Sequence, residues 1–185
     1  MQLSNAIKER RSVRSYKPKK PDWRQIIEAI DTARYAPMAG DIFSLKFMLI
    51  DDADKIKEIA KWSSQEFIQD AKYVVAFITD PKLTLNAYPE LGKKFLRQQA
   101  GAAIQNFLLT ITEIGLGTCW IAHFNEERIK QLLKIPKENQ IEGIFPIAYG
   151  KTKPRTKRLK GDLDHTLYFN EWKNRYMKKP ESIDV

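Results

Sequence analysis

The sequence has few of the residues that form disulfides or metal sites. One cysteine and two histidines occur among 185 residues. A single cysteine excludes a disulfide within the chain and fits a reducing compartment. One cysteine and two histidines also cannot supply the four ligands of a usual structural zinc site, so no metal site is expected. We expect Cys119 to be a small core residue; as a nucleophile its one evident base would be His123.

Long uninterrupted apolar runs are also missing. The most apolar stretch, residues 97–121, is broken by Gln98, Gln99, Gln105, Asn106, Thr112 and Glu113. A membrane-spanning helix needs about 20 consecutive apolar residues, so no membrane span is expected. The N-terminal segment lacks the apolar run of a signal peptide, and we therefore expect a cytoplasmic protein.

Acidic residues are outnumbered by basic ones. The 32 Lys and Arg against 23 Asp and Glu give a formal net charge of +9. Such a charge raises the hypothesis of nucleic-acid binding through the two basic maxima at 8–24 and 151–160. The surplus is otherwise scattered, and no zinc spacing, RNA-binding aromatic motif or recognition helix accompanies it. We therefore expect no nucleic-acid partner, while the two basic clusters could still bind one small anion.

Residues 97–114 carry apolar side chains at helical spacing and on the other faces as well. This pattern predicts a long core helix that is buried on nearly every side. Gly115 and Gly117 end it, because glycine supplies a left-handed cap and permits close approach of another group. The following stretch, 118–121, predicts a short buried strand. The resulting elbow has backbone that a ligand could reach.

The remaining elements predict one α+β domain. A short helix is expected at 3–10 with Leu3, Ala6 and Ile7 inward, and Asp22 is expected to cap a second helix. The clearest central strand is 72–79. Further elements are expected as strands at 46–50 and 141–149, helices at 51–61, 64–69 and 125–133, and an irregular segment at 81–94.

Glycine and proline interrupt the last predicted strand. Gly143 and Pro146 both lie within 141–149. Proline cannot donate to a sheet ladder and is confined mainly to edge strands and strand starts. We therefore expect this strand to lie at an edge of the sheet or to begin late.

Three arginines surround a hydroxyl group near the N-terminus. Arg10, Arg11 and Arg14 flank Ser12, and alternate residues of an extended segment share one side. Guanidinium groups bind phosphate oxygens in pairs, and Ser adds a neutral donor. The segment could therefore hold a phosphate, which the basic run 151–160 could close from the far end of the chain. The alternative is an exposed basic turn.

Taken together, these motifs resemble the nitroreductase family of FMN-dependent oxidoreductases. Each motif is weak alone, but their order and spacing are specific and extend over nearly the whole chain. The resemblance is carried by Ile7–Tyr16, Ala36–Asp41, Ala102–Leu109, Gly115–Ile121, Ile135-Pro136 and Ala148–Arg155.

The family resemblance implies a fold and an assembly. It implies an α+β fold with a central, mostly antiparallel sheet flanked by helices around the long core helix. It further implies a homodimer with an FMN at each interface site, touched by both subunits. The chain would be a single domain over 1–185 whose C-terminal arm, about 165–185, packs on the partner subunit.

The resemblance also implies an activity. FMN would take hydride from NAD(P)H at flavin N5 and pass it, in a ping-pong cycle, to a small-molecule electron acceptor such as a nitroaromatic or a quinone. No catalytic side chain is implied, because the cofactor carries the chemistry. The alternative is a flavin-binding storage or sensing protein with little NAD(P)H turnover.

Site residues follow from the matched motifs. The resemblance assigns phosphate and ribityl contacts to Arg10, Arg11 and Ser12, joined by Arg158, with Arg155 or Lys157 as alternatives. It assigns the pyrimidine edge of the flavin to Arg14 and the approach to N5 to the backbone of Ala122 and His123. Gln99 matches a polar residue that faces the cofactor from the core helix of the partner.

Two departures from the family pattern concern the substrate side. Asp41 stands where the family usually has Asn, and an ionised carboxylate accepts hydrogen bonds but cannot donate them. Asp41 is still expected to accept from flavin N3–H. The segment between Thr79 and Lys94 is shorter than in many members, which suggests an open pocket. Three aromatic residues could stack on a ligand in such a pocket, or else pack in the ordinary way: Phe43, Tyr88 and Phe95.

Overall fold

The computed structural model describes residues 2–151 and 161–177. Backbone contacts divide the chain into two units, residues 1–154 and 155–185, and each is described by itself. The expected phosphate ligands Arg155 and Arg158, with Lys157 between them, lie outside the described residues. The prediction of a single domain over 1–185 stays a prediction.

The first unit has the predicted order of helices and strands. Its elements are α1 (Leu3–Glu9), α2 (Trp23–Ala33), η1 (Ala39–Asp41), β1 (Leu45–Ile50), α3 (Ala53–Trp62), η2 (Glu66–Asp70), β2 (Tyr73–Thr79), α4 (Lys82–Ala87), α5 (Gly92–Glu113), β3 (Gly117–Thr118), α6 (Glu126–Leu133) and β4 (Gln140–Ala148). Helix α4 corrects the expectation that 81–94 is irregular. The Asp80 carboxylate accepts from the Lys82 N–H at 3.2 Å, and Pro81 has helical φ and ψ, so both favour a helix start there.

The sheet has four antiparallel strands in the order β1-β2-β4-β3. Strand β2 is paired on both edges and buried along its whole length, as expected of the central strand. Its residues alternate between the two faces, so Val75 and Phe77 enter one core while Val74 and Ala76 enter the other. The predicted fold class, a central antiparallel sheet flanked by helices, is confirmed.

Both alternatives predicted for the last strand are wrong, because β4 begins at Gln140 and is not an edge strand. Strand β4 lies between β2 and β3. The Ile144 N–H donates to Ile121 on the β3 side at 3.0 Å, so Pro146, two residues later, has its nitrogen turned the same way. The ladder there stops after Thr118 and resumes at Ile121. Proline is tolerated in this inner strand because no ladder donor is required opposite the gap.

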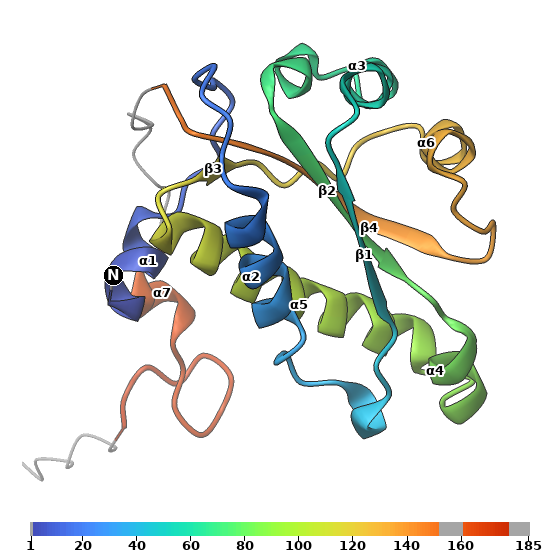
Figure 1. Cartoon of the computed structure of the whole chain (residues 1–185). Coiled ribbons are helices and arrows are strands. Elements are labelled where there is room, and N and C mark those ends of the chain that lie inside the picture. The colour runs from blue at the N-terminus through green and yellow to red at the C-terminus, as the bar shows by residue number, and fades with distance from the viewer. Residues whose placement is uncertain (1, 152–160, 178–185) are drawn as a thin grey trace, which may run out of the picture. The chain divides into compact units, whose positions relative to one another are not determined.

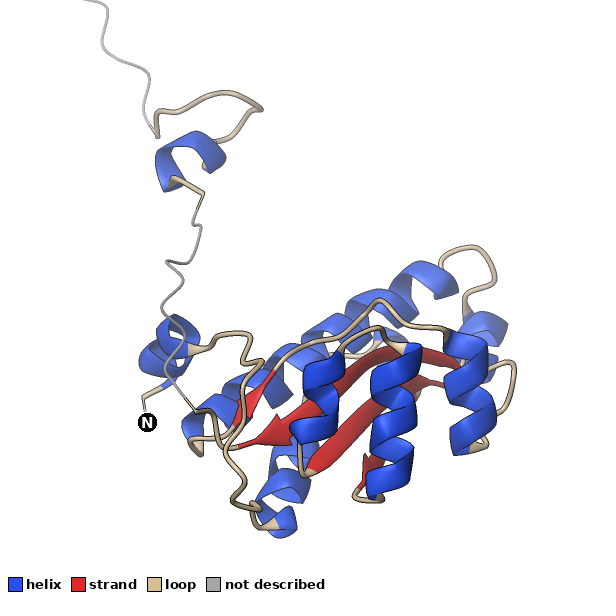
Figure 2. Cartoon of the chain, turned by 90° about the horizontal axis from the view of Figure 1, so that it is seen from above, coloured by secondary structure: helices blue, strands red, loops and turns tan. Residues whose placement is uncertain are grey.

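Helices cover both faces of the sheet (Figures 1 and 2). Helices α2 and α5 pack on one face, and α3 and α6 pack on the other. The aromatic centre of the first core joins Phe107 of α5 to Phe77 and Phe145 of the sheet, with ring centroids 5.0 Å and 5.5 Å apart. Burial on both faces explains why the inner strands are apolar almost throughout.

Helix α5 is the long buried helix predicted from the sequence. It has 22 residues, and Ala103, Ile104, Phe107 and Ile111 are fully buried. One stripe of the helix, with Ala102 and Leu109, remains partly exposed in the single chain. Among the described residues, no helix is both long and apolar enough to cross a bilayer.

Helix α5 ends in the glycine cap expected there. Gly115 has φ of 76°, in the left-handed region. The Leu116 N–H donates to the Ile111 carbonyl at 3.0 Å, and the Gly115 N–H donates to the Thr112 carbonyl at 3.1 Å. These two bonds form a Schellman motif, which satisfies the last carbonyls of the helix and turns the chain toward β3.

Helix α1 buries less than its apolar pattern suggests. Ala6 is 3 % exposed, whereas Leu3 is 66 % and Ile7 is 43 % exposed. The expectation that all three point inward is therefore wrong for Leu3 and Ile7. The helix lies against α5 at the margin of the core, where one small residue makes the buried contact and its larger neighbours project past the core.

The described part of the second unit, residues 161–177, contains one short helix. Helix α7 (Leu163–Thr166) is capped by Asp162, and the rings of Tyr168 and Trp172 lie 4.7 Å apart. Trp172 is nevertheless 79 % exposed. An exposed aromatic segment fits the predicted C-terminal arm, but its packing on a partner subunit stays a prediction.

Glu142 places a carboxylate in the interior part of β4. It accepts a hydrogen bond from the Thr79 hydroxyl at 2.8 Å. Burial raises the pKa of Glu142, and the Thr79 hydrogen bond and the Arg97 charge offset only part of that effect. The native state therefore holds this proton more tightly than the unfolded chain does, so the contribution of Glu142 to stability falls as pH rises through its raised pKa.

We expect Glu142→Gln to become more stable relative to wild type as pH rises from about 4 to about 7. The amide removes the buried charge and keeps an oxygen that accepts from Thr79. Denaturant unfolding at several pH values measures the difference. Glu90→Gln, at an exposed carboxylate, is the charge-matched control. A stability difference that does not change with pH would contradict the prediction.

Candidate functional site

The N-terminal arginine segment is fixed against the elbow that follows α5. Ser12 forms a parallel bridge with Thr118, and the Val13 N–H donates to the Thr118 carbonyl at 2.8 Å. A Cβ atom on Gly117 would lie 2.9 Å from Val13 Cγ1. Gly117 therefore permits a close approach, as the sequence suggested, and the group that approaches is part of the same chain.

Tyr16 fixes the other end of the segment. It is 2 % exposed, and its hydroxyl donates to the Val13 carbonyl at 2.8 Å. Burial raises the pKa of Tyr16, so the hydroxyl stays protonated and remains a donor. The backbone also pairs with the end of β4, since Lys17 N–H donates to Tyr149 and Lys151 N–H donates to Ser15. Residues 12–17 thus run between the elbow and the start of the second basic run.

The fixed backbone leaves polar side chains at the surface. Ser12 and Arg14 are exposed, and Arg10 and Arg11 are partly exposed. The Arg11 guanidinium donates to the carbonyls of Lys8 and Arg10, which holds it close to the segment. No ion pair joins Arg14 to a carboxylate in the described part of the chain. The segment therefore presents positive charge that an anionic ligand could neutralise.

Ala122 and His123 lie in a loop that is pinned on both sides. Ile121 exchanges two backbone hydrogen bonds with Ile144, both 3.0 Å long, and the Asn125 N–H donates to the Trp62 carbonyl at 2.8 Å. Both Ala122 and His123 are exposed, and neither backbone N–H donates to another group in residues 2–151 and 161–177. The loop is rigid at its ends and offers two neighbouring donors to a ligand.

Asp41 and Gln99 lie together at a second place. Gln99 is near the N-terminal end of α5, and its Oε1 atom accepts from the Ala39 N–H at 3.2 Å. Asp41 ends the η1 turn that contains Ala39 and is exposed. Figure 1 shows this turn near the α4 end of α5, whereas β3 follows the other end.

The predicted site residues therefore form two groups. We call Arg10, Arg11, Ser12 and Arg14, with the loop at 122–123, the arginine group, and Asp41 with Gln99 the turn group. The helix rises about 1.5 Å per residue, so Gln99 lies about 20 Å along α5 from Glu113, after which the chain turns to the Thr118 elbow. One chain does not bring all of its predicted site residues together.

The three candidate stacking residues behave differently. Tyr88 and Phe95 pack edge to face with centroids 5.1 Å apart, so the ordinary-packing alternative describes them. Phe43 is 41 % exposed, and its ring lies 6.5 Å from that of Phe47. Phe43 is the aromatic of the three that is most accessible to a ligand.

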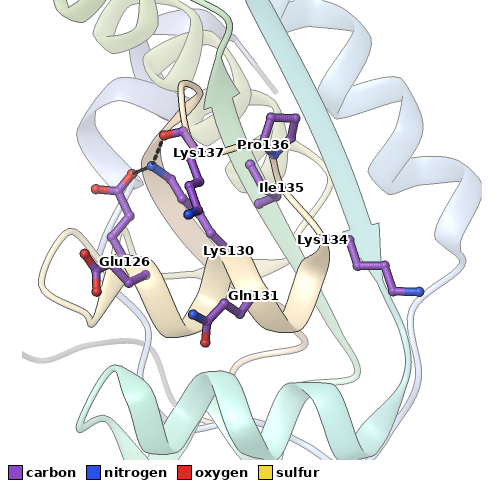
Figure 3. Close-up of a pocket in the computed structure, with 8 residues that line it drawn as sticks. Glu126, Lys130, Gln131, Lys134, Ile135, Pro136 and Lys137 are labelled. Atoms are coloured by element: carbon purple, nitrogen blue, oxygen red, sulfur yellow. Dashed lines mark hydrogen bonds and ion pairs between the residues drawn. The ribbon is translucent and has the colours of Figure 1, made fainter.

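A cavity of about 690 Å³ lies elsewhere on the unit, along α6 and the turn after it (Figure 3). It contains none of the predicted site residues. Its Lys130 ammonium pairs with Glu126 at 2.9 Å and donates to the Lys137 carbonyl at 3.3 Å (Figure 3). The lining carries charges of both signs, and Lys130 is already paired. This arrangement does not indicate a particular ligand.

Comparison with known proteins identifies the family of the chain. The model of the family described as "Nitroreductase family" matches residues 7–150. The chain belongs to the nitroreductase family. The match includes every predicted site residue except Arg155 and Arg158.

Individual nitroreductase-family relatives are distant in sequence and similar in structure. An Archaeoglobus fulgidus protein with the provisional name NADH dehydrogenase/NAD(P)H nitroreductase is 27% identical over 150 residues, covering 78% of this chain and 83% of its own. A nitroreductase family protein from Clostridium novyi NT has a TM-score of 0.76 at 26% identity, covering 96% and 98% of the two chains. Oxidized iodotyrosine deiodinase bound to FMN and 3-iodo-L-tyrosine has a TM-score of 0.76 at 19% identity, covering 87% and 97%.

Two buried residues with hydroxyl groups hold the segments that carry the predicted site residues, and they were not themselves predicted as site residues. Tyr16 holds the arginine group, and Ser44 accepts from the Gln99 amide at 2.5 Å. Neither side chain is charged, and neither belongs to a spacing pattern of its own. Ser44 contacts Gln99, which is 55 residues away, and Tyr16 contacts the carbonyl of Val13, which no side-chain pattern reveals, so both roles appear only in the fold.

We expect Gly117→Ala to destabilise the protein by about 1–3 kcal/mol, because the added Cβ would overlap Val13. Thermal or denaturant unfolding measures the loss. Gly161→Ala is the matched control, because its Cβ would meet only Thr166 Cγ2, at an ordinary 3.5 Å. Equal stability of Gly117→Ala and wild type would show that the segment is not held against the elbow.

Proposed function

We propose that this chain is an FMN-dependent oxidoreductase that takes reducing equivalents from NAD(P)H and passes them to a small acceptor such as a nitroaromatic or a quinone. The observation that carries the proposal is the arginine group. Within residues 2–151 and 161–177, Arg14 has no carboxylate partner and the Ala122 and His123 N–H groups have no acceptor, and Ser12 lies beside Thr118 in the elbow. Membership of the nitroreductase family and the FMN bound to iodotyrosine deiodinase support the choice of FMN.

The donors present fit the two chemical ends of FMN. Arg10, Arg11 and Ser12 would hold the phosphate, since guanidinium and hydroxyl donors suit its oxygens. Arg14 would lie at the pyrimidine edge, and the N–H groups of Ala122 and His123 would lie toward N5. Arg155 and Arg158 remain candidates for the phosphate, outside the described residues.

FMN, when bound, supplies the acceptance and donation of hydride. The chain has three tasks: to bind the phosphate, to keep the ring against the 122–123 loop, and to stabilise negative charge at the reduced ring. A fixed cation can perform the last task, and the exposed Arg14 would supply it. No acid or base among the side chains is required, because the cofactor carries the chemistry.

The separation of the two groups supports a homodimer. Gln99 lies about 20 Å along α5 from the helix end that leads to the Thr118 elbow, which disfavours a pyrimidine site completed by the turn group and Arg14 of one chain. A second copy could place its own Asp41 and Gln99 beside the arginine group of the first. The exposed Leu3 and Ile7 of α1 and the partly exposed Leu109 of α5 would be covered in such a dimer.

Purification without added cofactor tests the proposal directly. We expect a yellow protein that releases about one FMN per chain on acid treatment and consumes NAD(P)H when a quinone is added. A yellow protein without steady-state NAD(P)H consumption would favour the storage or sensing alternative. A colourless protein that also fails to bind added FMN would contradict the proposal.

We expect Arg14→Ala to weaken FMN binding about 10- to 100-fold, the effect of losing one hydrogen bond to a charged group. It should also lower the reduction potential of bound FMN, because the negative charge of the reduced ring loses its cation. Fluorescence titration and spectroelectrochemistry measure the two quantities. The control is Arg128→Ala, which removes an exposed arginine of α6 that lies over the ring of Trp62 in α3. If both quantities keep their wild-type values, Arg14 does not have this role.

A further inference from the structure

Gln99 is a buried amide whose two polar atoms both have partners inside the chain. Its side chain is 4 % exposed. Oε1 accepts from the Ala39 N–H at 3.2 Å, and Nε2 donates to Ser44 Oγ at 2.5 Å. The acceptor that faces a backbone N–H must be the oxygen, which fixes the orientation of the amide. Gln99 thus joins α5 to both ends of the segment 39–44.

The segment that Gln99 holds has a costly backbone conformation. Gly40 and Asp41 have φ of 58° and 55°, so two consecutive residues are left-handed. Asp is among the few residues other than glycine that adopt this region with any frequency, and a left-handed residue still costs about 1–2 kcal/mol. Such a conformation persists only where the surroundings enforce it.

The turn has support on a second side. A Cβ atom on Gly40 would lie 2.6 Å from the Tyr88 hydroxyl, so the tyrosine covers the turn closely. Tyr88 is in turn packed against Phe95 of α5. Ser44, the second partner of Gln99, is 3 % exposed, and its carbonyl accepts from the Asp80 N–H at 2.8 Å. Gln99 and Tyr88 therefore support the turn from inside, while Gly40 and Asp41 remain exposed.

We infer that Gln99 is a positioning residue: it holds the left-handed Gly40–Asp41 turn, and the turn, not the Gln99 amide, contacts the flavin of the partner subunit. The inference rests on the proposed function. It revises the direct contact expected for Gln99, because an amide that is buried and bonded at both atoms must break an internal hydrogen bond to turn toward a ligand. Asp41, exposed at the end of the turn, then presents the acceptor for an N–H group.

The Gln99–Ala39 hydrogen bond also joins two residues that line a neighbouring cavity. A cavity of about 280 Å³ is lined by Pro37, Met38, Ala39, Phe95, Gln98, Gln99 and Ala102. Met38 and Ala39 belong to the chain that enters the turn, so the Gln99–Ala39 hydrogen bond helps to set one wall. Loss of that bond is expected to change the shape of the cavity together with the position of Asp41.

Gln99→Leu tests the inference, because leucine keeps the apolar volume and loses both hydrogen bonds. Hydrogen exchange in the protein freed of flavin should speed up for residues 39–42, and FMN binding should weaken about tenfold, the effect of one to two hydrogen bonds. Gln99→Glu should restore much of the slow exchange at 39–42 and of the FMN affinity, since its oxygens can accept from the Ala39 N–H and the Ser44 hydroxyl. Ser44→Ala, which removes one anchor, should have a smaller effect. Gln131→Leu, at an exposed glutamine on α6, is the matched control.

Three outcomes would overturn the inference. Weaker FMN binding with unchanged exchange at 39–42 would make Gln99 a direct ligand. Faster exchange with unchanged FMN binding would remove the turn from the site. Failure of the wild-type protein to bind FMN would refute the proposed function, and the exchange experiment, which needs no flavin, distinguishes that failure from an error about Gln99. Thermal unfolding of each variant confirms that the comparison is made on folded protein.

Discussion

The burial of α5 is the constraint on which the rest of the first unit depends. A helix that is apolar on nearly all sides must be covered, and α2 and one face of the sheet cover it. Its rings interlock with those of β2 and β4 through Phe77, Phe107 and Phe145. Because the helix is rigid and 22 residues long, it also fixes how far apart its two ends hold their polar neighbours.

Each end of α5 builds one half of the proposed site by a different device. At the C-terminal end, the Schellman cap at Gly115 turns the chain into β3, and the Thr118 backbone holds the arginine segment through Ser12 and Val13. At the N-terminal end, Gln99 holds a left-handed turn. The first device uses main-chain hydrogen bonds and the second uses the Gln99 side chain, so neither requires the side chains of Arg14 or Asp41.

The sequence was most informative where one local pattern decides the structure. The apolar spacing of 97–114, the Asp22 and Asn125 caps and the alternation-free strand 72–79 correctly predicted α5, α2, α6 and β2. Pro146 gave a wrong prediction of an edge strand. An inner strand tolerates this proline because the pairing between β3 and β4 is interrupted opposite it. The partners of Gln99 and the separation of the two site groups depend likewise on tertiary packing. Motifs therefore identified candidate residues without showing which of them share a site.

The division of the site between two subunits is tested most directly with a mixed dimer. Arg14→Ala and Gln99→Leu chains carrying different tags are co-expressed, and the dimer with one of each is isolated. If the site is shared, one of its two sites carries both changes and the other carries neither, so half of the sites should bind FMN with wild-type affinity while both homodimeric variants bind weakly throughout. Weak binding at every site of the mixed dimer would show that both groups serve the same subunit and would contradict the account.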